Sequence, residues 1–304
     1  MTPPHAGVGA LDAARPYAVH PEGTPQFIDL QSHSTASDGA LPPAQVMAAA
    51  REAGLHAIAL TDHDTVDGLA EAQAAADAHG VRLVPGVELS THFGEDELHL
   101  LGLHLQDTDV MRDALEALQR DRVTRAGSIV TLLNRAGIPI TMESVLAEAA
   151  GAAVGRPHVA RVMVAGGYVR EFREAFDKWL GWGRPAFVGK PRFEVADGIA
   201  LVHKAGGLAV WAHPGETATA ARVATLASVG LDGVEVLHPS HPPYLVERLF
   251  GVVEAAGLVP SGGSDWHGAA EGPRRLGGQL VPKTWLDWQD ARVAARRAGG
   301  GLPG

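Results

Sequence analysis

Histidine and carboxylate side chains stand directly after several strand-like apolar runs of this 304-residue chain. The run at residues 27–30 leads to His33, and the run at residues 57–60 leads to Asp62 and His63. The same placement recurs at Glu88, His99, His213, Glu235, Asp265 and His267. Imidazole and carboxylate ligands suit hydrolytic Mn, Zn or Fe centres. The pattern therefore predicts a polynuclear hydrolytic metal site.

The other histidines lack this placement, and an isolated histidine is more often structural than a metal ligand. This interpretation covers His5, His20, His56, His79, His92 and His203. His99 and His104 belong to one expected strand, whose alternation places them on opposite faces. We expect His99 to face the site and His104, at the exit of the strand, to be solvated.

Composition restricts the class of protein further. The chain has no cysteine, so disulfides and thiolate ligands are excluded. No run approaches the roughly 18 apolar residues of a membrane span, and the N-terminus lacks secretory-signal features, so we expect a cytoplasmic protein. The net charge of −10 argues against nonspecific binding to duplex nucleic acid. No membrane partner is expected, since no apolar span is present. Residues 107–195 nevertheless carry 13 basic and 11 acidic side chains, which makes this segment slightly basic.

Strand-like runs alternate with expected helices, several of which end at glycine, and this predicts parallel strands with crossover helices. These helices cover residues 42–53, 66–79, 195–205, 217–229 and 243–256. Between residues 107 and 192 the alternation stops. Consecutive helices are expected there without intervening strands, at residues 110–136, 142–150, 157–165 and 172–180.

The expected fold class is α/β, a TIM-like barrel with a helical insertion and with the active site at the carboxyl ends of the strands. A doubly wound open sheet is the alternative, because periodicity alone does not show closure. The predicted domains are the barrel at 26–106 and 193–298 and a helical substrate-binding insertion at 107–192. Residues 1–25 are expected to be a flexible extension and residues 299–304 a flexible tail.

Five motifs in this order resemble those of the polymerase and histidinol phosphatase (PHP) family of metal-dependent phosphoesterases. They are DLQSHS at 29–34 with SDG at 37–39, TDHDT at 61–65, PGVELS at 85–90, AHP at 212–214 and GSDWH at 263–267. The resemblance covers nearly the whole chain from Phe27 to about Leu280. Residues 155–161 and 183–188 resemble the insertion of the branch that acts on nucleoside 3′,5′-bisphosphates and short 5′-phosphorylated RNA.

The resemblance implies a distorted seven-stranded barrel that holds two or three divalent ions, with Mn as the first expectation and Zn, Fe or Mg as alternatives. It implies that a metal-activated water attacks phosphorus, with Asp62, His63, Glu88 and Asp265 as the catalytic residues. Glu88 would bridge the first and second ions. The implied ligands are Gln31, His33, Glu88 and Asp265 for the first ion, Glu88, His99 and His213 for the second, and Asp38, His63 and His267 for the third.

Gln31 departs from the family pattern, which has histidine at this position. A glutamine carbonyl is a neutral oxygen donor and binds a borderline divalent cation more weakly than imidazole does. Three interpretations stay open: three ions with Gln31 as a weak ligand, two ions, or loss of activity.

Basic residues of the insertion are candidates for binding substrate phosphate. Arg156, His158 and Arg161 lie at an expected helix start with Pro157 in its first turn, where phosphate is favoured. Solvation of a surface helix is the alternative role for each of them. The other substrate candidates are Lys190, with Arg192 beside it, and His238 and His241, for which capping of the following helix is the alternative.

These features together favour a phosphohydrolase that removes the 3′-phosphate of nucleoside 3′,5′-bisphosphates and also hydrolyses short 5′-phosphorylated RNA. The expected partners are therefore a small phosphorylated nucleotide or short RNA, and the sequence identifies no protein partner. Histidinol-phosphate phosphatase is the second enzymatic hypothesis. A noncatalytic metal- or nucleotide-binding module, which has lost activity because Gln31 replaces histidine, is the third hypothesis.

Overall fold

The computed structural model describes residues 26–149, 154–189 and 192–298. The predicted N-terminal extension, the predicted tail and Lys190 lie outside the described residues. One mixed sheet forms the centre, with the strand order β7-β6-β5-β4-β3-β2-β1-β8. The strands are β1 (Phe27–Asp29), β2 (Ala57–Leu60), β3 (Arg82–Phe93), β4 (Asp96–Leu103), β5 (Leu208–Trp211), β6 (Gly233–Leu237), β7 (Val259–Gly262) and β8 (Val281–Pro282).

The sheet curls into a nearly closed barrel because the end of β7 meets the end of β1. Leu30 donates its backbone N–H to Gly262 O at 3.0 Å, and Ser32 forms a parallel bridge with Trp266. A Cβ on Gly263 would lie 2.5 Å from the backbone nitrogen of Gln31, so only glycine permits this approach. These contacts confirm the barrel rather than the open sheet.

The sheet departs from the expected parallel arrangement at two strands, β8, which is antiparallel to β1, and β4. β3 and β4 form an antiparallel hairpin, and β4 is also antiparallel to β5. The two residues between β3 and β4 leave no room for a crossover helix, and Gly94 in this turn has a φ of 65°. The hairpin therefore reverses the chain where a parallel unit was expected.

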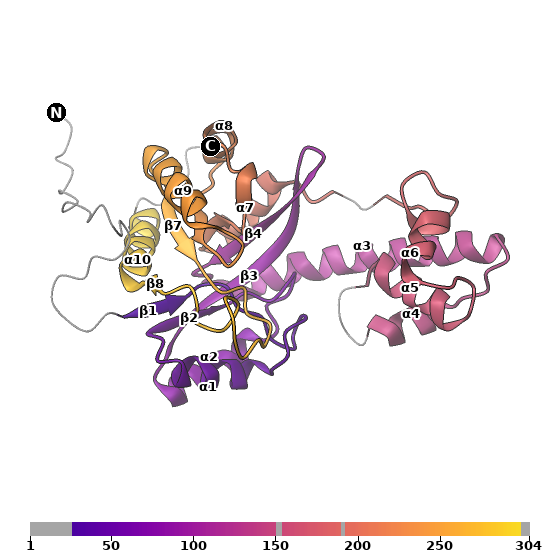
Figure 1. Cartoon of the computed structure of the whole chain (residues 1–304), viewed down its shortest axis with the longest axis horizontal. Helices are drawn as coiled ribbons and strands as arrows, with labels where there is room; N and C mark the ends of the chain where they lie inside the picture. Colours follow the sequence, from indigo (N-terminus) through magenta and orange to yellow (C-terminus); the bar gives the residue numbers. More distant parts are fainter. Residues whose placement is uncertain (1–25, 150–153, 190–191, 299–304) are drawn as a thin grey trace.

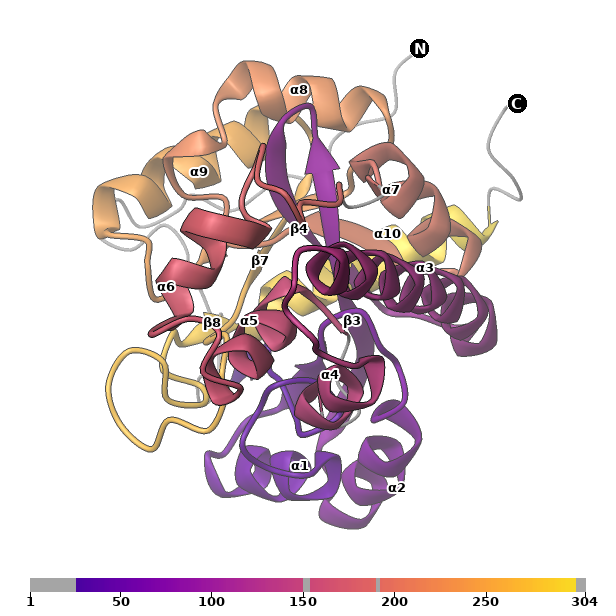
Figure 2. The same cartoon turned by 90° about the vertical axis from the view of Figure 1, so that its right-hand side faces the viewer.

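Helices surround the sheet on the outside, as Figure 2 shows. Strands β2 and β5 are buried at every position, which fits a sheet covered by helices. The predicted helices are confirmed with shorter bounds at most ends. They are α1 (Pro43–Glu52), α2 (Leu69–His79), α7 (Val195–Lys204), α8 (Ala220–Ser228) and α9 (Pro243–Ala255). A short 3-10 turn η2 (Gly215–Thr217) precedes α8, and the last helix, α10 (Lys283–Ala298), was not predicted.

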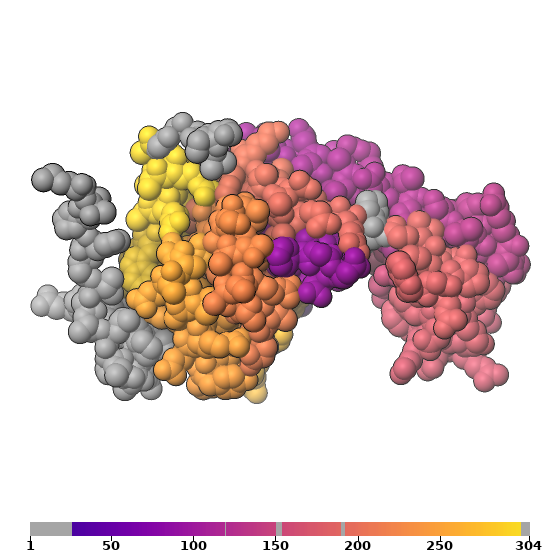
Figure 3. Space-filling model, turned by 90° about the horizontal axis from the view of Figure 1, so that it is seen from above, coloured from indigo at the N-terminus to yellow at the C-terminus, as the bar shows by residue number. Residues whose placement is uncertain are grey.

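The segment between β4 and α7 is helical in its described parts and has its own hydrophobic core, separate from that of the barrel. Its long first helix α3 leads away from the barrel to the others, and a wide notch separates the two bodies (Figures 1 and 3). The division into domains at residues 107 and 192 stays a prediction. The helices are α3 (Thr108–Arg135), α4 (Met142–Ala149), α5 (Arg156–Ala165), α6 (Phe172–Ala175) and a π-helical turn η1 (Phe176–Leu180).

Among the described residues, no helix combines the length and the apolar character that crossing a bilayer requires.

Candidate metal centre

Most of the histidines and carboxylates predicted from the sequence converge at one site on the barrel, although Glu88 lies within β3 and His99 within β4 rather than after a strand. Three groups of possible ligands overlap there, and within each group the ligand atoms lie within 4.8 Å of one another. His33, His63 and Glu88 each belong to two of the groups. The groups are His33, Asp38, His63 and His267; His63, Glu88 and His99; and His33, Glu88 and Asp265.

Glu88 is at the centre of the site and is fully buried. Its Oε1 lies 2.7 Å from His99 Nδ1 and 3.0 Å from His213 Nε2. Its Oε2 accepts a hydrogen bond of 2.9 Å from Gln31 Nε2 and lies 3.3 Å from His33 Nε2. One carboxylate thus faces four side chains from three different segments, as a bridging ligand would.

His33 provides the test of whether these residues fit a metal ion. It is fully buried, yet neither ring nitrogen has a hydrogen-bond partner among the described residues, although Nε2 lies 3.2 Å from Asp265 Oδ1. Gln31 Oε1 is also buried without a partner. Because buried polar atoms in folded proteins nearly always have partners, these atoms fit coordination of a cation.

Asp38 connects the third group of ligands. Its Oδ1 lies 3.2 Å from His267 Nε2, and its Oδ2 lies 3.9 Å from His63 Nε2. The His33 ring stacks between those of His63 and His267, with centroids 4.6 and 4.1 Å away. Asp38 is exposed, so this group is the one most open to solvent.

The backbone is strained at two of these positions. His213 has a φ of 30° and Asp265 a φ of 50°, in the left-handed region that non-glycine residues rarely adopt. Such strain clusters at functional sites, where the surrounding structure enforces it. Here it turns both side chains toward Glu88 and His33.

Electrostatics keeps the carboxylates ionised. Burial would raise the pKa of Glu88, but contacts with His213, His33 and His99 hold it well below its ordinary range. Burial opposes protonation of His33, but the carboxylates of Asp265 and Glu88 raise its pKa to about 10. Without cations the surroundings of His33 therefore favour a positive charge on its ring, which is the charge that divalent ions would supply.

Asp62 does not join the groups of possible ligands. Its Oδ1 accepts hydrogen bonds from Ser34 N at 2.7 Å and Ser37 Oγ at 2.6 Å, and its Oδ2 accepts one from Ser34 Oγ at 2.7 Å. Asp62 thus holds the loop between His33 and Asp38. Its predicted catalytic role stays a prediction, and its contacts fit positioning of that loop.

Glu235 lies within β6 and stands behind the site. Its Oε2 accepts a hydrogen bond of 2.7 Å from His213 N, and burial raises the pKa of its carboxyl well above the ordinary range. Glu235 therefore supports the strained backbone of His213. His104 is buried rather than solvated, because its Nε2 lies 3.1 Å from Gln289 Oε1; the expectation for His104 was wrong.

The predicted substrate residues of the insertion separate into two kinds. Arg156 is half-buried, lies over the rings of Phe176 and Phe187 and donates to Leu180 O at 3.2 Å. His158 Nδ1 instead accepts from Gly155 N at 3.0 Å, which caps its own helix.

Arg161 pairs with Glu148 on the surface at 2.6 Å, and Arg192 pairs with Glu95 at 2.5 Å. Neither His158, Arg161 nor Arg192 is recorded in contact with the metal-type side chains among the described residues. The alternative structural roles therefore describe these contacts better.

The two candidates after β6 also differ. His241 Nδ1 donates to Val236 O at 2.9 Å, and its Nε2 accepts from Gly215 N at 3.2 Å, so both nitrogens serve the backbone. His238 Nδ1 accepts from Ser240 N at 3.1 Å, while its buried Nε2, 3.6 Å from Asp265 Oδ2, has no hydrogen-bond partner among the described residues. Only His238 is therefore available to the site.

Three arginines near the site were not predicted. Arg122 on α3 pairs with Asp64, the residue after His63, and Arg125 donates from Nε to Val188 O at 2.9 Å. Burial and the charges of Arg156 and Arg122 lower the pKa of Arg125 to about 10. Arg274, in the loop after His267, pairs with Asp265. The slightly basic composition of residues 107–195 was the one signal that pointed to the first two.

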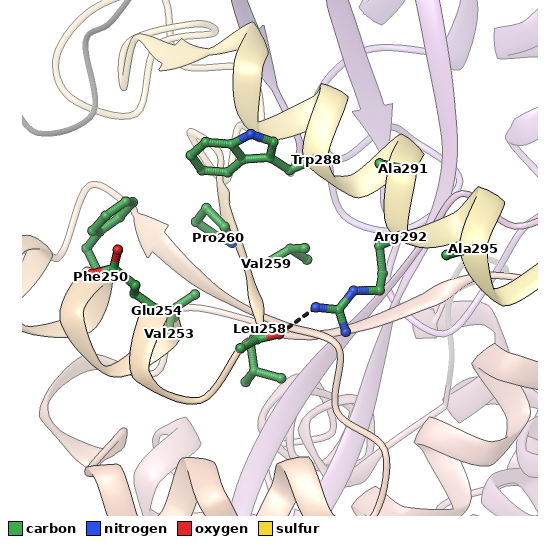
Figure 4. Close-up of a pocket in the computed structure, with 11 residues that line it drawn as sticks. Phe250, Val253, Glu254, Leu258, Val259, Pro260, Trp288, Ala291, Arg292 and Ala295 are labelled. Carbon is green, nitrogen blue, oxygen red and sulfur yellow. Dashed lines mark hydrogen bonds between the residues drawn. The ribbon is translucent and has the colours of Figure 1, made fainter. Parts of the chain in front are cut away.

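Cavities accompany this centre. One of about 310 Å³ is lined by His63, Glu88, His238 and Arg274, among others, and one of about 540 Å³ adjoins it at His99 and His213. A third, of about 470 Å³, lies between α9 and α10 at the other end of β7, bounded by Phe250 and Trp288 (Figure 4). Its lining contains no histidine, so it offers no comparable ligand set.

Comparisons with known proteins agree with this geometry. The PHP domain family matches residues 29–181. A 3′,5′-nucleoside bisphosphate phosphatase of Chromobacterium violaceum is 35% identical over 259 residues, which cover 82% of this chain and 90% of the relative. The 5′-3′ exoribonuclease Rnm of Escherichia coli is 34% identical over 247 residues, which cover 79% and 84%. A solved structure from Bifidobacterium adolescentis superposes with a TM-score of 0.69 at 30% identity, covering 89% and 98%.

Proposed function

The chain belongs to the PHP domain family, and we propose that it is a metal-dependent phosphohydrolase that removes the 3′-phosphate from nucleoside 3′,5′-bisphosphates. The observation that carries this proposal is the overlap of three ligand groups at His33, His63 and Glu88. Shared ligands let neighbouring cations act on one phosphoryl group, as in polynuclear phosphatases. The overlap thus supports phosphoester hydrolysis over single-metal binding.

The residues of the centre form three sets, each of which would hold one divalent ion. His33, Glu88 and Asp265 would hold one ion, Glu88, His99 and His213 a second, and Asp38, His63 and His267 a third. When bound, divalent ions, with Mn as the first expectation and Zn, Fe or Mg as alternatives, would acidify water and neutralise phosphoryl charge.

The substrate phosphate that is not cleaved would bind to the insertion. Burial and the charges of Arg156 and Arg122 depress the pKa of Arg125, and Asp64 is the one carboxylate paired with these three arginines among the described residues. A phosphate dianion would offset this repulsion and accept charge-assisted hydrogen bonds. The arginines replace His158 and Arg161 in the predicted clamp, whereas Arg156 is retained.

The activities of two relatives bear on the substrates that we propose for this chain. One relative acts on nucleoside 3′,5′-bisphosphates and another is a 5′-3′ exoribonuclease. Both names fit a substrate with one phosphate at the ions and another at the arginines, so short 5′-phosphorylated RNA is a second substrate of the proposed enzyme. Histidinol phosphate has a single phosphate and leaves the arginines unused.

The test is phosphate release from adenosine 3′,5′-bisphosphate by metal-stripped protein titrated with Mn, beside histidinol phosphate. We expect turnover of the bisphosphate and its loss by at least about 100-fold in His63→Ala and Asp265→Ala. His79→Ala, on the exposed end of α2, is the control and should keep wild-type activity. Full activity in both site variants would refute this site, and silence under every metal would favour the noncatalytic alternative.

A further inference from the structure

Arg274 lies in a loop that bends over the metal-type centre. It is the one arginine or lysine among the residues that line the 310 Å³ cavity between His63, Glu88 and Asp265. Its Nη1 pairs with Asp265 Oδ2, while the opposite oxygen of Asp265 faces His33 at 3.2 Å. A permanent positive charge thus stands at the mouth of a cavity whose other charged side chains are carboxylates and histidines.

The loop that carries Arg274 is fixed at both ends by one buried side chain. Asp29 Oδ1 accepts from Ser264 N at 2.9 Å, and Asp29 Oδ2 accepts from Gly277 N at 2.8 Å. Within the loop, Gln279 Nε2 donates to Pro273 O at 2.8 Å, and Trp266 Nε1 donates to Ala269 O at 2.8 Å. These bonds give the backbone around Arg274 a defined path, so its position over the cavity is built into the fold.

We propose that Arg274 is a catalytic residue of this chain that contacts the phosphoryl group undergoing transfer. Its guanidinium has five N–H donors, and the pairing with Asp265 leaves donors for an anion in the cavity. Asp265 can face a cation through Oδ1 and hold Arg274 through Oδ2 at the same time. Arg274 then places a fork of donors where charge develops on the phosphoryl oxygens.

This role deepens the proposed phosphohydrolase function, but a binding measurement tests it separately. The probe is inorganic phosphate, titrated calorimetrically into the Mn-loaded full chain, with Mn content measured in every sample. We expect Arg274→Ala to weaken phosphate binding at least 10-fold at unchanged Mn content, and Arg274→Lys to retain part of the affinity. Arg275→Ala is the matched control, since Arg275 is exposed and its recorded hydrogen bonds come from its backbone.

Several results would overturn the role of Arg274. Unchanged phosphate affinity in Arg274→Ala would do so, as would absence of phosphate binding by loaded wild type. If excess Mn restores the phosphate affinity of Arg274→Ala, Arg274 acts only by positioning Asp265 and the metal. If Arg274→Ala does not fold, Arg274→Gln serves instead. The binding result is independent of turnover: phosphate binding that depends on Arg274, without hydrolysis of any substrate, would overturn the proposed function and the catalytic role and leave Arg274 as a phosphate-binding residue.

Discussion

Gln31 Nε2 donates a hydrogen bond of 2.9 Å to Glu88 Oε2, so an amide hydrogen points to the carboxylate that two of the three ligand groups share. An amide nitrogen is not a metal ligand, and this orientation leaves Gln31 Oε1 buried without a partner. Imidazole at position 31 would instead offer a nitrogen lone pair. We predict that Gln31→His binds an additional equivalent of Mn, or binds its weakest equivalent at least about 10-fold more tightly.

Metal counting after equilibrium dialysis measures this difference without reference to activity. Gln279→His, in the loop after β7, is a matched control that should leave the count unchanged. Equal stoichiometry and affinity in wild type and Gln31→His would show that Gln31 already serves as an adequate ligand, with its amide turned the other way.

The barrel and most of its ligands could be predicted because the relevant signals are local. Most candidate ligands, such as His33, His63 and His213, follow a short apolar run, so their position after a strand is encoded within a few residues, whereas Glu88 and His99 lie within β3 and β4. Closure of the sheet rests on the close approach of Gly263 to Gln31, which only the three-dimensional arrangement shows. The β3–β4 hairpin was missed because its strands have the same apolar character as parallel ones.

The residues proposed to bind substrate were less predictable, because their positions depend on contacts between residues distant in sequence. Arg122 meets Asp64 across 58 positions, and no local pattern indicates which face of α3 turns to the barrel. For His158 and His241 the sequence and the structure point to different roles. Their neighbours in sequence resemble a substrate site, but Nδ1 of His158 and both ring nitrogens of His241 bind backbone groups.

The ion pair between Arg122 and Asp64 joins the insertion to the barrel. Both side chains are largely buried, with exposures of 18% and 6%. Arg122→Ala would leave the Asp64 carboxylate with only Ser90 as a partner among the described residues. We expect a loss of about 3 kcal/mol in the free energy of unfolding, measured by denaturant titration. The double variant Arg122→Leu with Asp64→Asn should recover much of this loss, and a loss as large as that of the single variant would contradict the ion-pair explanation.

His158 and Arg156 begin the same helix, α5, and provide a matched pair. His158→Ala removes the contact with Gly155 N and should lower stability by about 1 kcal/mol, with KM for adenosine 3′,5′-bisphosphate unchanged. Arg156→Ala should raise KM at least about 10-fold, because it removes one charge from the proposed phosphate clamp. Steady-state kinetics and thermal unfolding of both variants separate the two effects. A raised KM in His158→Ala alone would restore His158 as the substrate contact.

Metal removal should lower the stability of the folded chain. The buried nitrogens of His33 lack partners without a cation, and any ion that binds only the folded state stabilises it by mass action. We expect Tm to fall by several degrees in chelator and to recover with Mn, whereas Asp265→Asn should show a smaller recovery. An identical Tm with chelator and with excess Mn would show that the folded chain does not bind Mn at this centre.

His241 is expected to make stability depend on pH below neutrality. Burial first, and then the charges of His238 and His213, lower its pKa from 6.5 to about 4, while Val236 O and Glu216 oppose the shift. Above pH 6.5 both the folded and the unfolded chain have this ring neutral, so its contribution to stability is fully present. As pH falls from 6.5 to 4, only the unfolded chain gains the proton, and stability is lost.

His241→Asn keeps an amide donor for Val236 O but does not titrate. The difference in unfolding free energy between wild type and variant should therefore shrink as pH falls through this window. Denaturant titrations of both proteins in chelator at pH 7.5, 6.0 and 5.0 measure this difference, and a constant gap across the three pH values would show that His241 is protonated as easily in the folded chain as in the unfolded one.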